Sequence, residues 1–409
     1  MLIEAGRKAI KGQGIRMLNV KNRIAYIIKY NNTIYSMYYY LFILCINVLK
    51  IFIKPDDKLI LFNSFAGRKF DDSPKAIFEA MKQDLRFNDF RLVWAFHDPS
   101  KFEVVGADKI KTDCLKYFKT ALAARVWITN SSVERGLNFT GKNTLYFNTW
   151  HGTTIKKMGK DISSDSQSFR TKGGKEVDVR MSQGKYETDI FSRTTGIAKD
   201  KFLEVGLPRN DILFNYTKEM KEVLKRKLEI STEKKVILYC PTFREYEKGM
   251  NYEIVLKPPI DLSKWKSKLG EKFILLFRAH YEVSKVMGIK EDSIIRNMTD
   301  YPDINDLMIV SDVLISDYSS VFFDYSITGK PMFHFTYDYD TSATKRGMYF
   351  DIREHLDGGS TEDELIELLL NYDELSAKKK TEQFRNKFVN YYGNAAKAAV
   401  DCIANRLSL

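Results

Sequence analysis

A candidate for proton transfer is His151, in the segment NTWHGTTIKKMG, just after a predicted strand at 145–149. An imidazole at the end of a strand can accept or donate a proton near neutral pH. Gly152 lets the backbone approach a ligand closely, and the hydroxyls of Thr153 and Thr154 can donate to oxygen atoms. A histidine in an ordinary turn would explain the same residues equally well.

Three further polar clusters follow predicted strands or open predicted helices. They contain Arg209 in VGLPRND, Thr242 in YCPTFR and Arg278 in FRAH. An arginine in such a place can set its planar guanidinium against a phosphate group. His280, two residues after Arg278, could donate to the same group or protonate a leaving oxygen. Taken alone, each cluster is explained at least as well by a surface turn.

A fifth cluster, SDYSSVFFDY, places Ser319 and Ser320 between a predicted strand and a predicted helix. Backbone amides and hydroxyls at the start of a helix can bind phosphate without cationic side chains. Asp324 lies one turn further, on the same helix face as Ser320, where it could orient a hydroxyl or support the helix dipole. An ordinary serine cap is the alternative explanation.

The elements that must position these clusters alternate between short apolar strands and helices. Strands are predicted at 58–62, 91–96, 125–129, 145–149, 235–239, 273–278, 313–315 and 331–335. Helices are predicted at 73–81, 112–124, 213–228, 304–310, 320–328, 361–371, 374–389 and 395–404. This alternation is typical of parallel α/β sheets. The strands form two sets, so we expect two Rossmann-like domains, with ligands at the carboxyl ends of the strands.

All five polar clusters lie at strand ends in these two sets, and all favour contact with an anion. A cleft between two domains that binds a nucleoside diphosphate explains them better than five coincidences. The polar segment 161–175, rich in glycine and serine, follows the His151 cluster and is predicted to be a mobile lid loop.

The composition is that of a globular protein. The chain has 409 residues, of which 44% are hydrophobic and 29% charged. These values exclude wholesale disorder, a collagen-like fibre and a polytopic membrane protein. The four cysteines are scattered without a CxxC pair, which favours a reducing compartment and argues against a zinc site. The formal net charge of +12 admits nucleic acid, an anionic membrane or a phosphorylated substrate as a partner.

Half of the net charge lies in residues 1–29, where seven basic residues accompany one acid, Glu4. The apolar and aromatic segment 34–53 that follows is about as long as a membrane-spanning helix. We favour a helix that lies in the membrane interface, with its basic neighbour on anionic lipid. A core helix and a true membrane span are the alternatives, and the absence of a cleavage site disfavours a signal peptide.

The motifs NTWHGTTIKKMG, GLPRNDIL, PTFR, RAH and SDYSSVFFDY, in this order and at this spacing, resemble the CDP-glycerol glycerophosphotransferase family of teichoic acid primases and polymerases. The resemblance covers about residues 58–340. It implies an α/β, GT-B-like fold in which two Rossmann-like domains face a donor cleft. The expected organisation is a basic and aromatic membrane-associating segment (1–54), an acceptor-side domain (55–212) and a CDP-donor domain with the C-terminal helices (213–409).

The resemblance also implies which residues form the CDP-glycerol site. They are His151, Gly152, Thr153, Thr154, Ile155, Arg209, Pro241, Thr242, Arg278, Ala279, His280, Ser319, Ser320 and Asp324. His151 and His280 are the two expected catalytic residues. The family usually has proline where this chain has Thr154 and Tyr281, which leaves the shape of both loops and the identity of the polyol open.

The implied activity is transfer of glycerol phosphate from CDP-glycerol to a lipid-linked teichoic acid or capsule-type acceptor, with release of CMP. It would take place at the cytoplasmic face of the cell membrane, with the enzyme bound peripherally. His151 would take the proton of the acceptor hydroxyl, while Arg278, His280 and the two serines would stabilise charge on the phosphates. No DxD motif stands where a metal would bridge the diphosphate, so we expect no cofactor and no essential metal.

Three alternatives stay open. The first is a ribitol-phosphate transferase of the same family, and the second is a GT-B glycosyltransferase that uses a nucleotide sugar. The third is a basic module that binds anionic lipid without turnover. The sequence shows no RNA-binding signature, so nucleic acid is not expected as a partner. The acceptor, the choice between single addition and polymerisation, and the oligomeric state are left open by the sequence.

Overall fold

The computed structural model describes residues 31–134, 136–141, 143–162, 177–231, 233–242, 258–279, 289 and 291–409. These residues fall into two compact units. One unit holds the helix α3 (Asn32–Phe52) and residues 134–139, and the other holds both β-sheets and the helices that pack on them. His280 and most of the predicted lid loop 161–175 lie outside the described residues.

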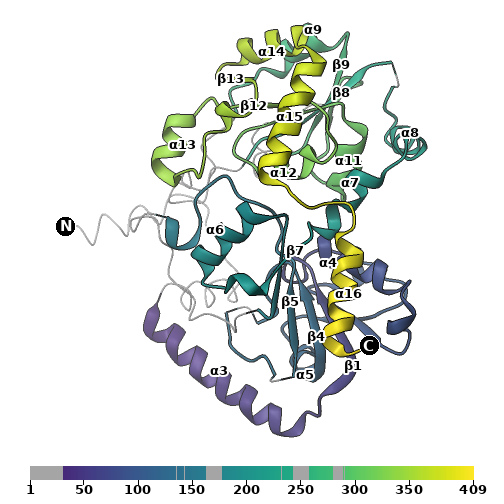
Figure 1. The fold of residues 1–409 in the computed structure, drawn as a ribbon, viewed down its shortest axis with the longest axis vertical. Helices are drawn as coiled ribbons and strands as arrows, with labels where there is room; N and C mark the ends of the chain where they lie inside the picture. Colours follow the sequence, from purple (N-terminus) through teal and green to yellow (C-terminus); the bar gives the residue numbers. More distant parts are fainter. Residues whose placement is uncertain are drawn as a thin grey trace, which may run out of the picture. The chain divides into compact units, whose positions relative to one another are not determined.

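Helix α3 carries the apolar, aromatic segment expected at 34–53 (Figure 1). The Asn31 side chain caps the helix by accepting hydrogen bonds from two amides of the first turn, and Lys50 in the last turn complements the helix dipole. By length and composition, the stretch Thr33–Phe52 could cross a membrane. Most of its side chains are exposed, and a helix lying in the membrane interface would meet the same criteria.

The first sheet has seven strands, in the order β3-β2-β1-β4-β5-β6-β7, and its neighbouring strands pair in parallel. They are β1 (Asp56–Asn63), β2 (Arg91–Phe96), β3 (Asp108–Lys111), β4 (Ala124–Thr129), β5 (Leu145–Asn148), β6 (Val179–Ser182) and β7 (Phe202–Glu204). Helices α4 (Asp72–Met81), α5 (Leu115–Ala123) and α6 (Lys185–Thr195) pack on these strands. Strands covered on both faces are buried on both, which is why RLVWAF and ARVWIT are apolar almost throughout.

The second sheet has six strands, in the order β10-β9-β8-β11-β12-β13, again paired in parallel. They are β8 (Lys235–Cys240), β9 (Phe273–Phe277), β10 (Ile295–Asn297), β11 (Val313–Ser316), β12 (Met332–Phe335) and β13 (Gly358–Gly359). The accompanying helices are α7 (Asp211–Asn215), α8 (Lys218–Lys227), α9 (Leu262–Leu269), α11 (Ile304–Val310), α12 (Val321–Ser326), α13 (Tyr339–Arg346), α14 (Glu362–Asn371) and α15 (Glu374–Phe388).

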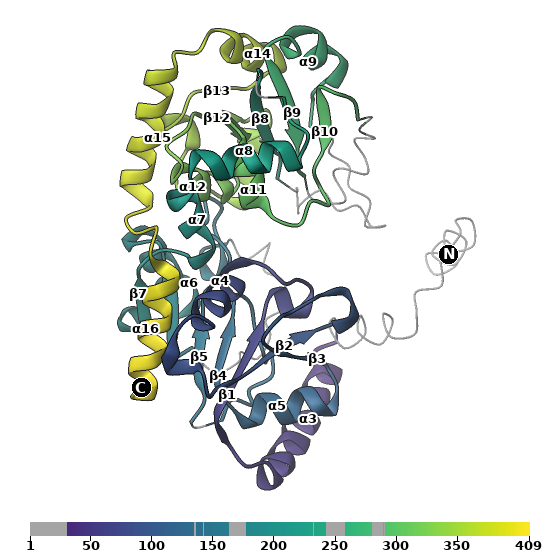
Figure 2. The same ribbon diagram turned by 90° about the vertical axis from the view of Figure 1, so that its right-hand side faces the viewer.

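The last helix, α16 (Ala395–Leu407), departs from the expected organisation. The sequence assigned it to the second domain, but it packs on α4, in the core of the first sheet (Figure 2). Small side chains such as Ala399 and Ala404 allow this close contact. The carboxylate of Asp211 accepts hydrogen bonds from two backbone amides in the first turn of α16, at 2.8 and 2.7 Å. The domain boundary expected at residue 212 stays a prediction, because both sheets belong to one compact unit.

Both sheets reverse their strand order at one point. In the first sheet, the chain runs outward from β1 through β2 to β3 and then returns to place β4 on the other side of β1. The second sheet repeats this with β8, β9, β10 and β11. This is the order of doubly wound folds, in which ligands bind outside the carboxyl ends of the strands at the reversal. The loops after these strands are therefore where a site is expected.

The strands predicted from the sequence are confirmed, with ends shifted by up to two residues. The short strands β3, β6, β7, β10 and β13 are absent from the prediction, since two to four residues carry too little apolar pattern. The helix predicted at 213–228 is divided into α7 and α8. The break comes where Thr217 caps the second helix by accepting from the amide of Met220.

Candidate active site

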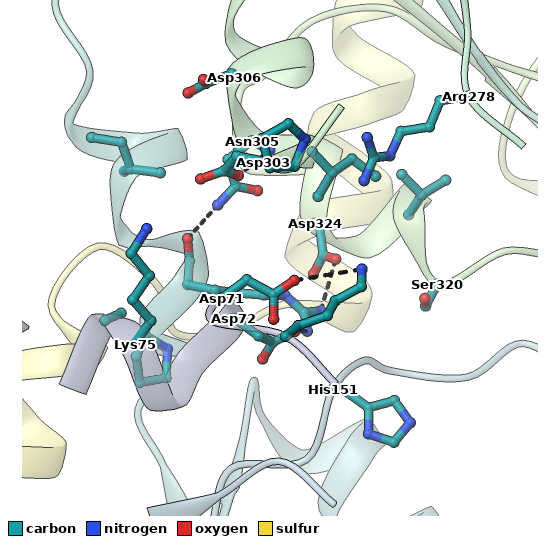
Figure 3. Close-up of a pocket in the computed structure, with 18 of the residues that line it drawn as sticks. Asp71, Asp72, Lys75, His151, Arg278, Asp303, Asn305, Asp306, Ser320 and Asp324 are labelled. Atoms are coloured by element: carbon teal, nitrogen blue, oxygen red, sulfur yellow. Dashed lines mark hydrogen bonds and ion pairs between the residues drawn. The ribbon is translucent and has the colours of Figure 1, made fainter. Parts of the chain in front are cut away.

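The loops at the two reversal points line one cavity of about 920 Å³ (Figure 3). Its walls come from the start of α4 and the segment Pro208–Asn210 on one side, and from the loops after β8, β9 and β11 on the other. The predicted site residues that line it are His151, Arg209, Pro241, Thr242, Arg278, Ala279, Ser319, Ser320 and Asp324. The structure therefore brings together residues from all five sequence clusters.

His151 lies on the loop after β5, and one hydrogen bond fixes the tautomer of its ring. Its Nδ1 is 2.7 Å from the backbone oxygen of Asn130. Because a carbonyl oxygen only accepts, Nδ1 carries the proton, and the lone pair is left on Nε2. Burial is the main cause that lowers the pKa of His151, so the ring is neutral near pH 7. A neutral imidazole with its lone pair on Nε2 is the form that a general base requires.

The backbone around His151 adopts unusual conformations. Trp150 has a φ of 54° and Gly152 a φ of 148°, and a positive φ is strained for a bulky residue such as tryptophan. Asn148 supports this turn by accepting from the Trp150 amide at 2.8 Å. A β-carbon at Gly152 would lie 3.0 Å from the Oγ of Ser320. Glycine therefore lets the loop meet the serine cluster of the second sheet.

The next three residues of this motif point into the protein interior or make contacts within their own loop. Thr153 is buried and donates its hydroxyl to Glu187 at 3.0 Å. Thr154 donates its hydroxyl to its own loop, and Ile155 packs in the core of the second sheet. None of these three side chains lines the cavity that the described residues form. Their predicted part in binding the donor stays a prediction.

Arg209 was expected to meet a phosphate, but its charge is already paired. Its guanidinium contacts Asp72 and Asp324 at 2.8 Å each, and these three side chains are only 8–9% exposed. Burial opposes the charged arginine, yet the two carboxylates raise its pKa above the usual value. Burial also raises the pKa of Asp324 despite this pairing. In this structure, Arg209 joins α4 to α12 while it also lines the cavity, and its contact with a phosphate stays a prediction.

Two asparagines extend the cluster around Arg209. Asn210 donates to Asp324 at 2.6 Å. Asn305, in the first turn of α11, donates its Nδ2 to the backbone oxygen of Arg209, also at 2.6 Å. This contact identifies the other atom of the Asn305 amide as oxygen, and that buried Oδ1 has no partner within the described part of the chain. The network ties the segment Pro208–Asn210 to α11 and α12 of the second sheet.

Arg278 lies at the carboxyl end of β9, with its guanidinium directed toward the cavity (Figure 3). Its Nη1 donates to the backbone oxygens of Met298, at 3.1 Å, and Tyr301, at 2.5 Å. These bonds fix the loop that leads into α11. Burial lowers the pKa of Arg278. Ala279 lines the same wall, whereas the catalytic role predicted for His280 stays a prediction.

The hydroxyls of the remaining motifs are arranged at the ends of β8 and β11. The carboxylate of Asp317 holds Thr242 by accepting from its hydroxyl at 2.6 Å and from its amide. Ser319 accepts from the Val321 amide at 3.2 Å. Ser320 precedes α12 but makes no capping hydrogen bond with its side chain. The ordinary serine cap is therefore not the explanation for Ser320, which lines the cavity instead.

Sequence reasoning missed three residues that shape the site. Asp72 stands in the segment DDSPKAIFEAM, where it resembles an ordinary acidic first turn, although its φ of 62° marks a strained backbone. Asn130 and Glu187 belong to no motif, because each acts on a residue far along the chain: Asn130 on His151 and Glu187 on Thr153. Burial raises the pKa of Glu187 to about 7.

Acidic residues also line the cavity, among them Asp71, Asp303 and Asp306 (Figure 3). Each has a structural hydrogen bond: from the Ser64 hydroxyl to Asp71, from an amide of α11 to Asp303 and from the Tyr301 hydroxyl to Asp306. Within the described residues, no group of three or more His, Cys, Asp or Glu side chains could hold a metal ion.

Known proteins resemble this chain along most of its length. Residues 46–405 match the family described as CDP-Glycerol:Poly(glycerophosphate) glycerophosphotransferase. A teichoic acid glycerol-phosphate transferase of Staphylococcus aureus is 32% identical over 337 residues, which is 78% of this chain and 85% of the relative. A teichoic acid poly(glycerol phosphate) polymerase of Staphylococcus epidermidis is 32% identical over 320 residues. That match covers 75% of this chain but only 44% of the polymerase, so the chain spans less than half of that longer protein.

A solved structure of the wall teichoic acid polymerase TagF superposes with a TM-score of 0.78 at 30% sequence identity. The superposition covers 87% of this chain and 90% of the TagF chain. By sequence and by fold, the chain belongs to the CDP-Glycerol:Poly(glycerophosphate) glycerophosphotransferase family.

Proposed function

We propose that the chain transfers glycerol phosphate from CDP-glycerol to a lipid-linked teichoic acid or capsule-type acceptor and releases CMP. The observation that carries this proposal is the neutral ring of His151, with its lone pair on Nε2, beside a cavity also lined by Arg278 and Ser320. The relatives named as glycerol-phosphate transferases and polymerases support it. Further support comes from a TagF variant whose structure was determined after a soak with CDPG.

In the proposed reaction, the hydroxyl of the acceptor attacks the β-phosphorus of CDP-glycerol. The bond between that phosphorus and the bridging oxygen breaks, and CMP leaves with the bridging oxygen. His151 accepts the hydroxyl proton on Nε2 while the Asn130 oxygen holds its Nδ1–H in place. Arg278 and Ser320 stabilise charge on the phosphates, and His280 is the second proposed catalytic residue. The two doubly wound sheets on either side of the cavity support a GT-B-like fold with the donor on the second sheet.

The test is release of CMP from CDP-glycerol in the presence of a lipid-linked acceptor. His151→Asn should lower kcat by at least about 10²-fold, which is the low end for loss of a general base. His97→Asn is the matched control, because His97 is half exposed and does not line the cavity. Wild-type turnover by folded His151→Asn would overturn the role of this residue. Turnover of CDP-ribitol alone, or of a nucleotide sugar alone, would reassign the donor.

We also propose that the chain binds the cytoplasmic face of the cell membrane peripherally. Support comes from exposed apolar side chains of α3, among them Leu41, Leu44 and Phe52, and from the basic residues 1–29. Sedimentation with vesicles that contain phosphatidylglycerol should exceed sedimentation with neutral vesicles and should fall with added salt. Extraction only by detergent would indicate a membrane span instead, and equal sedimentation with both kinds of vesicle would contradict the anionic surface.

A further inference from the structure

A buried positive charge that the proposed reaction does not use lies beside the His151 loop. Arg180, on β6, is 4% exposed and pairs in register with Asn148, two residues before Trp150. Its Nε and Nη2 have no hydrogen-bond partner among the described residues. A guanidinium that is buried with unbonded N–H groups lowers the stability of the fold. Its partners are the rings beside it and the carboxylate of Glu187 on α6, whose charge opposes the lowering of the Arg180 pKa by burial.

Arg180 contacts the ring against which His151 stacks. Its guanidinium carbon is 4.3 Å from the centroid of the Trp150 ring and 4.9 Å from that of Phe191. The rings of Trp150 and His151 stack with centroids 4.2 Å apart and an interplanar angle of 26°. The distances of 4.3 and 4.2 Å are both measured to the Trp150 ring, so the guanidinium carbon lies at most 8.5 Å from the centroid of the His151 ring. A cation–π contact of this kind stabilises the tryptophan ring in its place.

We propose that Arg180 is a positioning residue for the transfer reaction: through Trp150 it holds the ring of His151, and its charge favours the unprotonated imidazole. The inference rests on the proposed role of His151 as the base. Strain in the Trp150 backbone fits this arrangement, since a strained turn persists only where its surroundings hold it.

Some groups around His151 lower the pKa of its imidazole, and others raise it. Burial lowers its pKa most, Arg209 and Arg180 lower it further, and the Asn130 hydrogen bond and Asp72 raise it. Burial lowers the pKa of Arg180 to about 10, so the guanidinium remains charged near pH 7. A charge within 8.5 Å of a mostly buried imidazole acts through a low effective dielectric constant and disfavours its protonation. Removing the charge of Arg180 should therefore raise the pKa of His151 measurably.

The test is an NMR titration of His151 in the full-length protein, and it needs no substrate. The Cε1–Hε1 signal is assigned by its loss in His151→Asn and followed against pH in the wild type, in Arg180→Met, in Arg180→Gln and in Arg180→Lys. We expect the midpoint to rise by about one pH unit in the two neutral variants. We expect it to stay within a few tenths of a unit in Arg180→Lys, which keeps the charge.

An unchanged midpoint in a folded neutral variant would overturn the proposal, as would an equal shift in Arg180→Lys. If neither neutral variant folds, a midpoint in Arg180→Lys that differs from the wild type by more than a few tenths of a pH unit overturns the proposal. The pH profile of kcat/KM for CMP release provides a second measurement, in which the acidic limb should move together with the NMR midpoint. Failure of CDP-glycerol turnover would count against the proposed function but would leave the titration informative.

Discussion

The three-residue cluster of Arg209, Asp72 and Asp324 makes a strong prediction for stability. In Arg209→Met, an apolar side chain of similar length would leave two carboxylates facing each other with exposures of only 8 and 9%. Breaking a buried ion pair by removing one partner costs about 3–5 kcal/mol. We therefore expect this variant to lose about 3–5 kcal/mol of unfolding free energy near pH 7.5.

The sign of the pH dependence follows from the same geometry. Without the guanidinium, the buried carboxylate of Asp324 faces only the like charge of Asp72, so its folded-state pKa lies further above the value in the unfolded chain. The loss of unfolding free energy is then fully present at pH values above the folded-state pKa of Asp324. It shrinks as the pH falls toward the unfolded value of about 4, because the folded carboxyl group of Asp324 becomes protonated. The difference from the wild type should therefore be smaller near pH 5 than near pH 7.5.

Urea unfolding, followed by tryptophan fluorescence and circular dichroism at both pH values, measures these differences. Arg86→Met is the matched control, because Arg86 also bonds two carboxylates, Asp84 and Asp401, but its side chain is 35% exposed. Exposed pairs contribute little, so this variant should change stability far less. The reasoning is refuted if Arg209→Met loses no more stability than Arg86→Met, or if its deficit does not depend on pH.

Three further predictions concern the surroundings of the cavity. Gly152→Ala should slow CMP release at least about fivefold, because a β-carbon 3.0 Å from the Oγ of Ser320 adds strain to the loop that carries His151. A variant with the kcat of the wild type would contradict this prediction. Burial raises the pKa of Glu187 to about 7, so stability should fall as the pH rises from about 4.5 to 7. In Glu187→Gln, the unfolding free energy measured with urea should depend less steeply on pH over this range. An unchanged pH dependence would exclude the Glu187 carboxyl as its cause. Burial also raises the pKa of Cys240 to about 12. Iodoacetamide near pH 7.5 should therefore alkylate Cys240 far more slowly than the exposed Cys45, as measured by mass spectrometry. Equal rates of alkylation would contradict the burial of Cys240.

Much of the fold could be predicted because its signals are local. Apolar runs such as those of β1 and β8 are long enough to predict strands, and their alternation with helices predicts parallel sheets. The packing of α16 on the first sheet could not be predicted in this way. Helix α16 contacts α4, more than 300 positions earlier in the chain, and a contact at that separation leaves no periodic signal in either segment.

The sequence by itself determined that polar residues follow the strands of both sheets. Because parallel strands of one sheet end at the same edge, it also predicted that Arg278 and Ser320 would lie near each other. The cavity that they share with His151 depends on the packing of the two sheets, which the tertiary structure decided. Only the tertiary structure decided the state of each group. It set the tautomer of His151 through Asn130 and placed Arg209 between two carboxylates. Charge and hydrogen bonding depend on neighbours a few ångströms away, and folding brings those neighbours from distant parts of the chain.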